Sequence, residues 1–175
     1  FNIINIGRLT KQKDHITLLK ALKIVLKSIS CNLLIIGEGS ERKNINKFIH
    51  DNNLENNVNL AGYKSNPWKY LYKADLFVLS SIWEGFGNVI VESMMLGVPV
   101  ISSDCKSGPS EILNNGKYGP LFKIKDHIKL SELIIEEFNA RKIKNKSSAA
   151  KKRSQDFSIS KITSKYEESF QKLLT

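Results

Sequence analysis

The chain has few of the features that hold unusual folds together. Of its 175 residues only two are cysteine and four are proline. No apolar run approaches the ~20 residues that a membrane-spanning helix needs. Cys31 and Cys105 are too few for a disulfide framework, and a chain of this length buries roughly 70% of its unfolded surface without one. The sequence therefore argues against a disulfide scaffold and a transmembrane helix, and it favours a reducing, cytoplasmic compartment.

Metal-binding and nucleophile patterns are also missing. His15, His50 and His127 are scattered without the spacing of a metal site, so we interpret them as surface residues. No Asp-x-Asp pair occurs, and Cys105 has no base close to it in the sequence. We therefore expect neither a metal ion nor any other cofactor.

Negative charge is scarce as well, because 17 acidic residues face 27 basic ones and the net charge is +10. Such a charge attracts nucleic acid, anionic lipid or a phosphorylated small molecule. The basic stretch at 141–153 contains no aromatic residue, whereas nucleic-acid modules interleave aromatic and basic side chains. We therefore expect no nucleic-acid partner. We give two interpretations of this stretch equal weight: contact with an anionic membrane, and a helix that is simply exposed to solvent.

Short apolar runs alternate with helical periodicity along the whole chain, which predicts a doubly wound α/β domain spanning residues 1–175. About six parallel strands should be covered by helices on both faces. The predicted strands cover 1–6, 32–36, 58–61, 76–79, 98–101 and 121–122. The predicted helices cover 14–29, 40–49, 66–73, 87–96, 110–114 and 126–174. Ligands of such sheets bind at the carboxyl ends of the strands, so the loops that follow the strands should carry function.

Two of these loops contain glycine next to charged side chains. After the first strand, Gly7 permits a sharp turn, and Arg8 with Lys13 could clamp a diphosphate. A solvated turn is the alternative. The Gly37-Glu38-Gly39 turn is half of a dinucleotide-binding fingerprint, but an ordinary strand-to-helix turn explains it better.

The loop after the fourth strand is more specific. Gly85 and Gly87 free backbone amides to face an anion where the next helix begins. Glu84 stands before that helix, and Glu92 lies within an otherwise apolar stretch, where a carboxylate is costly unless it binds something. Sugar and ribose hydroxyls are suitable partners. The alternatives are a helix cap for Glu84 and a lysine-paired surface residue for Glu92.

Six motifs in a fixed order carry a family resemblance. They are Gly7-Arg8-Leu9 with Lys13, Gly37-Glu38-Gly39, Ala61-Gly62, Glu84 and Glu92 within S-x-x-E-G-F-G-N-x-x-x-E, Gly97-Val98-Pro99-Val100-Ile101, and Gly108-Pro109-Ser110-Glu111-Ile112-Leu113. Together they cover most of the chain. The sequence resembles the C-terminal, donor-binding domain of retaining glycosyltransferases of family 4, which have the GT-B fold. Asp14 stands where the family has Gly or Asn, and Ser107-Gly108 replaces Gly-Gly, so we assign the latter loop no contact.

The resemblance implies a role for each matching position. Glu84 matches the glutamate that contacts the donor sugar and is the expected catalytic residue, either as nucleophile or as positioner. Glu92 matches the glutamate that binds the ribose hydroxyls. The implied diphosphate-binding residues are Arg8, Lys13, Phe86, Gly87, Asn88 and Val89. The implied rim of the base pocket consists of Gly62, Tyr63 and Lys64.

The resemblance also implies the function. We expect the chain to bind a nucleotide-diphosphate sugar, and a UDP-sugar above all, as half of a hexosyltransferase that makes a cell-surface or lipid-linked glycan. An N-terminal domain absent from this chain should bind the glycan or lipid-linked acceptor, so the fragment alone should be inactive. A UDP-sugar epimerase and a basic nucleic-acid-binding module are the alternatives. A peripheral location of the enzyme at the cytoplasmic face of a membrane would fit the basic charge of the chain.

Overall fold

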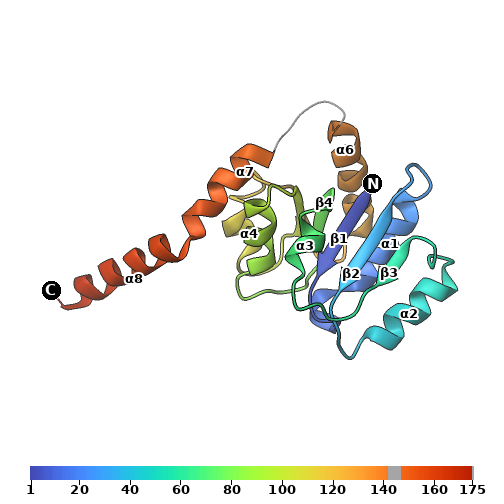
Figure 1. Ribbon diagram of the computed structural model, residues 1–175, viewed down its shortest axis with the longest axis horizontal. Helices are drawn as coiled ribbons and strands as arrows, with labels where there is room; N and C mark the ends of the chain where they lie inside the picture. Colours follow the sequence, from blue (N-terminus) through green and yellow to red (C-terminus); the bar gives the residue numbers. More distant parts are fainter. Residues whose placement is uncertain (142–146, 175) are drawn as a thin grey trace.

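Six parallel strands form one sheet in the order β3-β2-β1-β4-β5-β6. The computed structural model describes residues 1–141 and 147–174 (Figure 1). The strands are β1 (Asn2–Ile6), β2 (Asn32–Ile36), β3 (Val58–Leu60), β4 (Leu76–Leu79), β5 (Val100–Ser103) and β6 (Leu121–Phe122). This strand order confirms the doubly wound α/β fold predicted from the sequence.

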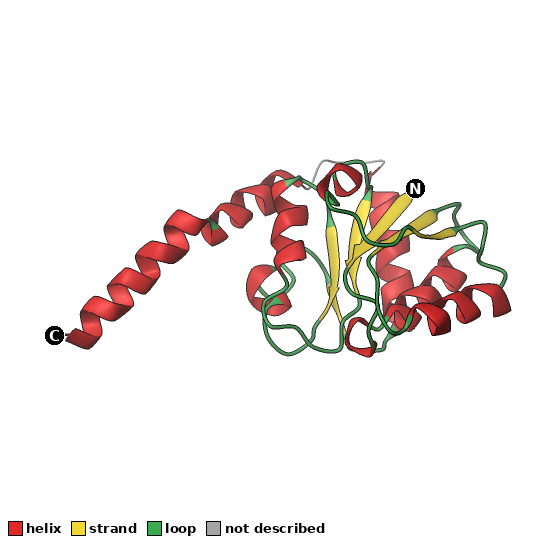
Figure 2. Cartoon of the chain, turned by 60° about the horizontal axis from the view of Figure 1, so that its bottom comes forward, coloured by secondary structure: helices red, strands yellow, loops and turns green. Residues whose placement is uncertain are grey.

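Helices cover both faces of the sheet (Figure 2). On one face α1 (His15–Val25), α2 (Arg42–Asp51) and α6 (His127–Arg141) bury apolar side chains such as Leu22 and Ile45. On the other face lie α3 (Trp68–Leu71), α4 (Asn88–Met95), α5 (Pro109–Ile112) and α7 (Ser147–Ser154). Two single-turn helices, η1 (Lys11–Lys13) and η2 (Gln155–Phe157), precede α1 and α8 (Ile159–Leu174) respectively.

Asp14 caps the start of α1. The Asp14 side chain accepts hydrogen bonds from the Thr17 amide at 3.3 Å and from the Thr17 hydroxyl at 2.7 Å. This bond satisfies one of the amides that a helix leaves unpaired at its start. Asp14 has a φ of 43°, a left-handed conformation that Asp tolerates better than most residues.

The fifth strand begins two residues later than predicted, at Val100 instead of Val98. Val98 still belongs to the turn after α4, because its amide binds the Ser93 carbonyl at 2.9 Å. The strand then continues through buried Ser102 and Ser103. Their hydroxyls bind the carbonyls of Ser103 and Ser81, so polar residues continue a strand that apolar patterning ends too early.

Among the described residues, the C-terminal region contains α6, α7, η2 and α8, and the break after Ser154 differs from the single helix predicted over 126–174. In both views α8 extends away from the sheet (Figures 1 and 2), and its apolar stripe is exposed, with Ile159 at 87% and Leu173 at 81%. Within the predicted basic stretch, Lys142, Lys144 and Lys146 lie outside the described residues, and Lys151 and Lys152 are exposed. Among the described helices, none is long and apolar enough to cross a membrane.

Candidate functional site

The candidate site lies where β1 and β4 end. These two strands are neighbours in the sheet, with Ile3 opposite Leu76 and Ile4 opposite Phe77. The chain moves outward from β1 through β2 to β3, and then returns to the other side of β1 for β4. Such a reversal leaves a crevice at the carboxyl ends of the strands. The loops after β1 and β4 therefore meet, although they are far apart in the sequence.

Lys13 and Glu84 form an ion pair at this crevice. The Lys13 Nζ lies 2.5 Å from Glu84 Oε1, and the same oxygen accepts a 2.6 Å hydrogen bond from the Ser81 hydroxyl. Only 16% of the Lys13 side chain and 7% of the Glu84 side chain are exposed. A charge-assisted bond in such a partly dehydrated place is stronger than a surface pair. In the structure, the lysine predicted to bind the diphosphate is thus paired with the glutamate predicted to contact the sugar.

Several backbone contacts hold this pair in place. The Ser80 hydroxyl donates to the Lys13 carbonyl at 2.9 Å, and the Ile82 amide donates to the Gln12 carbonyl at 2.8 Å. The Gln12 amide group also binds the Trp83 carbonyl at 2.8 Å. The two loops are therefore bonded to each other on both sides of the ion pair, which fixes the orientation of Lys13 and Glu84.

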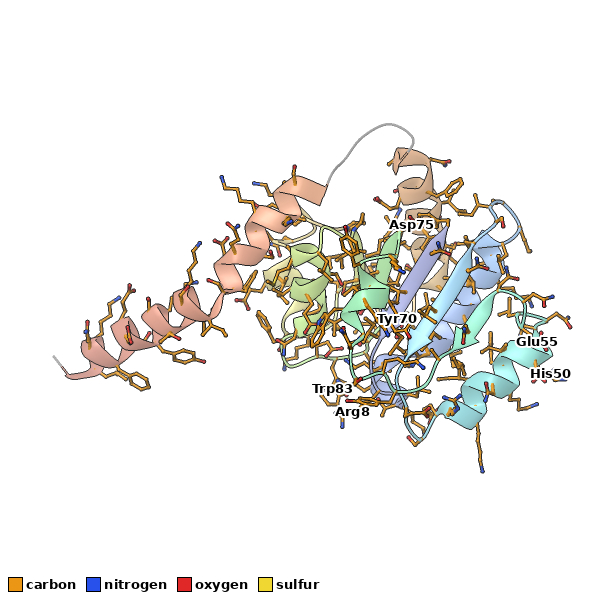
Figure 3. The ribbon with its side chains drawn as sticks, viewed as in Figure 1. Arg8, His50, Glu55, Tyr70, Asp75 and Trp83 are labelled. Atoms are coloured by element: carbon orange, nitrogen blue, oxygen red, sulfur yellow. The ribbon has the colours of Figure 1, made fainter. Side chains whose placement is uncertain are left out.

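Arg8 directly follows Gly7 in the loop after β1, and its side chain is exposed to solvent. Among the described residues, the Arg8 side chain has no hydrogen-bond or ion-pair partner, so its guanidinium is available to a ligand. Figure 3 shows Arg8 and Trp83 at the same edge of the molecule. The next residue, Leu9, is buried, and its amide and carbonyl bind Glu38 and Glu41 at 2.9 and 2.8 Å. The backbone that carries Arg8 is therefore anchored while the side chain remains exposed.

The loop from Phe86 to Val89 presents the open end of α4 to the crevice. Gly87 precedes the helix with a φ of 93°, which glycine adopts readily. Across the described part of the chain, no residue accepts a hydrogen bond from the amides of residues 86–89. These amides are the unpaired donors at a helix N-terminus, where the helix dipole favours an anion. The predicted residues Phe86, Gly87, Asn88 and Val89 therefore offer donors beside Lys13.

A very close backbone contact supports this loop. A Cβ atom on Gly108 would lie 1.8 Å from the Phe86 carbonyl oxygen, and Gly108 has a φ of 85°. Only glycine fits there. The Ser107-Gly108 loop, to which we assigned no ligand contact, thus has a structural role. Gly108 allows the start of α5 to pack against the loop before α4.

Glu92 lies on α4, one turn beyond Asn88, and is half-buried. Its Oε2 accepts a 2.9 Å hydrogen bond from the indole N–H of Trp68. Glu92 therefore pairs with Trp68 and not with a lysine, which was the alternative considered above. The Trp68 bond directs the carboxylate towards the segment after β3 and leaves its other oxygen for a hydroxyl group.

The predicted rim of the base pocket follows β3. The Gly62 carbonyl accepts a bond from the Gly37 amide at 3.0 Å, so the backbone of this rim is fixed to the loop after β2. Glu38 lies against Gly62 and pairs with Arg42 at 2.7 Å. Tyr63 is 75% exposed and Lys64 is half-buried. The rim is thus an open edge with an aromatic side chain in solvent.

His15 corrects one sequence interpretation and adds a residue to the site. We took it as a surface residue, but it is 2% exposed and binds Asn5 Oδ1 through Nε2 at 3.1 Å. The Asn5 amide group in turn donates to the Val78 carbonyl at 2.8 Å, which links β1 to β4 beneath Lys13. Burial, and then the Lys13 charge, lower the pKa of His15 to about 4, so the ring is neutral at physiological pH. A lone histidine at a helix start carries no sequence signal for this role.

Two other features carry none of the predicted roles. Burial raises the pKa of the Cys105 thiol, which disfavours a thiolate nucleophile. A groove of about 830 Å³ lies over β1, β2 and β3 beside α2 and α3, and none of the predicted site residues lines it. In the described part of the chain, no three His, Cys, Asp or Glu residues are grouped to hold a metal ion.

The sequence also matches proteins that are already known. Residues 1–155 match the family model described as glycosyl transferases group 1. An N-acetylgalactosaminyltransferase of Campylobacter jejuni, named for a diphospho-undecaprenol substrate, is 35% identical over 167 residues. This match covers 91% of the chain and 44% of the relative. The chain spans less than half the length of the first curated relatives that it matches.

Two solved structures share the fold over nearly the whole chain. TarM of S. aureus, solved with UDP among its ligands, is 30% identical and has a TM-score of 0.88, covering 95% of this chain and 34% of TarM. HepE of Anabaena, solved with UDP, is 25% identical and has a TM-score of 0.88, covering 98% of this chain and 49% of HepE. HepE has also been solved with UDP-glucose.

Proposed function

Because this chain belongs to the glycosyl transferases group 1 family, we propose that it binds a UDP-sugar as the donor half of a retaining glycosyltransferase. The observation that carries the proposal is the Lys13–Glu84 pair beside the open start of α4. A cation and unpaired amides suit a diphosphate, while a neighbouring carboxylate suits sugar hydroxyls. The UDP complexes of TarM and HepE support uracil as the base.

In the proposed complex the diphosphate lies between Arg8, Lys13 and the amides of residues 86–89. Arg8 supplies a planar guanidinium that can bind two oxygens at once, and Lys13 supplies a point charge. As the bond between sugar and diphosphate breaks, negative charge grows on the leaving phosphate, and these groups stabilise it. They do the electrostatic work that a metal ion does elsewhere, so the proposal includes no metal and no other cofactor.

The two glutamates divide the rest of the donor between them. Glu92, held by Trp68, accepts hydrogen bonds from the ribose hydroxyls. Glu84 contacts the sugar and helps to orient its anomeric carbon, either as nucleophile or as positioner. Gly62, Tyr63 and Lys64 border the base. Lys13 would then bind the diphosphate and Glu84 together, which links the leaving group to the sugar.

The acceptor half of the enzyme lies outside this chain in our proposal. The chain corresponds to under half of its curated relatives, so a second domain can supply the acceptor site across the crevice. The Campylobacter relative is named for a lipid-linked substrate, and a glycan or lipid-linked acceptor at the cytoplasmic face of a membrane suits the basic charge of this chain. We expect the isolated chain to transfer no sugar to any acceptor.

Calorimetric titration of the 175-residue chain with UDP tests the proposed function. We expect binding that survives an excess of EDTA, and Arg8→Ala together with Lys13→Ala should abolish it. Lys27→Ala with Lys165→Ala is the matched control, because both lysines are exposed, Lys27 just after the end of α1 and Lys165 on α8. Binding that disappears with EDTA would show that the donor site needs a metal. No binding of UDP at all would refute the proposed function.

A further inference from the structure

The ring of Phe86, in the loop that leads into α4, contacts a residue near the C-terminus. Phe157 of η2 meets it edge to face, with 5.5 Å between the ring centroids and 63° between the ring planes. Phe157 lies just beyond the segment that matches the family model, which ends at residue 155. The loop that offers its amides to the crevice is therefore contacted from outside the matched domain.

Arg153 holds Phe157 in position. Its guanidinium lies over the Phe157 ring at 4.7 Å from the centroid, a cation–π contact. The same guanidinium donates to the carbonyls of Glu111 and Ile112 at 2.9 and 3.3 Å. These carbonyls belong to the last two residues of α5, and the Glu111 carbonyl also accepts a bond from the Asn114 amide at 3.2 Å. Arg153 thus bonds the segment around Phe157 to α5.

These contacts close a ring around Phe86. α5 begins directly after Gly108, and Gly108 lies against the Phe86 carbonyl. Phe86 is therefore held from its backbone by Gly108 and from its side chain by Phe157, while Arg153 connects the two supports. We call Arg153 and Phe157 the Phe86 clamp. In Figure 1, α7 lies near α4, and η2 leads on into α8.

We propose that Phe157 is a positioning residue, which fixes the amides of residues 86–89 for the diphosphate by holding Phe86. The proposal rests on the proposed function, because it concerns the same phosphate-binding loop. A loop ordered before the ligand arrives loses less conformational entropy on binding, so a fixed loop binds phosphate more tightly. If Phe157 only covered the core between α4 and α5, its removal would change stability and not the affinity for phosphate.

Titration of the 175-residue chain with UDP and with uridine separates these roles. Phe157→Ala should weaken UDP about two- to tenfold, the range of an aromatic pair, and leave the affinity for uridine unchanged. Phe157→Leu keeps the apolar bulk, so it should reduce the affinity for UDP by a smaller factor. This variant provides the test if Phe157→Ala does not fold. Phe157→Tyr keeps the ring and should restore UDP binding.

Phe170→Ala is the control, because it removes the same ring from α8, where Phe170 is 63% exposed. It should change the affinity for neither ligand. An unchanged ratio of UDP to uridine affinity in the Ala and Leu variants would overturn the positioning role, even if the variants were less stable. A wild-type chain that binds no UDP would instead refute the proposed function, and the positioning role with it.

Discussion

The Lys13 ammonium nitrogen lies 2.5 Å from a carboxylate oxygen of Glu84, although the two residues are 71 positions apart in the sequence. The pair means that neither charge is free before a ligand arrives. In the proposed complex, a diphosphate bound to Lys13 shares it with Glu84, and the sugar at Glu84 lies next to its leaving phosphate. The proposal therefore links the two parts of a nucleotide-sugar through the Lys13 nitrogen.

Replacing Glu84 should separate the sugar from the nucleotide. Because the proposed role of Glu84 is to contact the sugar, Glu84→Gln should leave the affinity for UDP unchanged or raise it slightly, as Lys13 loses a competing partner. The affinity for intact UDP-sugars should fall. Calorimetry with UDP and with a panel of UDP-sugars measures both. Weaker UDP binding in this variant, to the same extent as in Glu92→Gln, would contradict the assignment.

Glu92→Gln should weaken UDP and UDP-sugar alike. A hydrogen bond to a charged group contributes about 1.5–3 kcal/mol, so the loss should be roughly ten- to a hundredfold. Trp68→Phe is the companion variant, since it removes the indole N–H that holds Glu92 but keeps the carboxylate. It should cost less affinity than Glu92→Gln. Unchanged UDP affinity in Glu92→Gln would exclude a ribose contact.

Protonation of His15 should destabilise the fold in mild acid. Burial lowers its pKa from 6.5 to about 4, so between these values the unfolded chain takes up a proton that the native chain does not. The free energy of unfolding should therefore fall as the pH falls from 6.5 to 4, by roughly 3 kcal/mol at most. Urea titrations across this range should show a flatter pH dependence for His15→Gln. His127→Gln is the control, because it removes a histidine that lies outside the buried contact with Asn5.

Gly108→Ala should destabilise the chain and also weaken UDP. The added Cβ would lie 1.8 Å from the Phe86 carbonyl oxygen, so the phosphate-binding loop must shift. Overpacking of this kind costs about 1–3 kcal/mol, and the positive φ adds strain. Gly85→Ala is the control for stability, because no atom lies within 4 Å of its Cβ position. Equal urea midpoints for the two variants would show that the contact can relax freely.

The alternation of apolar and helical periods was sufficient to predict the sheet, because parallel strands are buried on both faces and read as continuous apolar runs. Polar residues that continue an element were not predictable in the same way. Ser102 and Ser103 lengthen β5 only because hydrogen bonds within the sheet satisfy their hydroxyls. His15 is buried for the same reason, since Asn5 from another element provides its partner.

The candidate site was predictable as a set of residues, but its internal bonds were not. The motifs placed Lys13 and Glu84 in loops that a parallel sheet brings to one edge, and Glu92 in the helix that follows the second of these loops. The sequence could not show that Glu84 pairs with Lys13 or that Glu92 pairs with Trp68, because these bonds depend on how distant loops pack. The alternatives of a helix cap for Glu84 and a lysine partner for Glu92 were local interpretations, and long-range contacts replaced both.

The pairing of β1 with β4 has a consequence for how the site comes into being during folding. Residues 2–60 can form β1, β2 and β3 from contacts between segments that follow one another in the sequence. The contact of β4 with β1 joins residues that are much farther apart, since Asn5 and Val78 are separated by 73 positions. Contacts of such long range form slowly, since closing the intervening loop costs entropy. Lys13 comes from the half of the sheet that contains β1, β2 and β3, and Glu84 follows β4, in the half that contains β4, β5 and β6. The crevice therefore does not exist in either half alone, and its first appearance marks the moment when the two halves join.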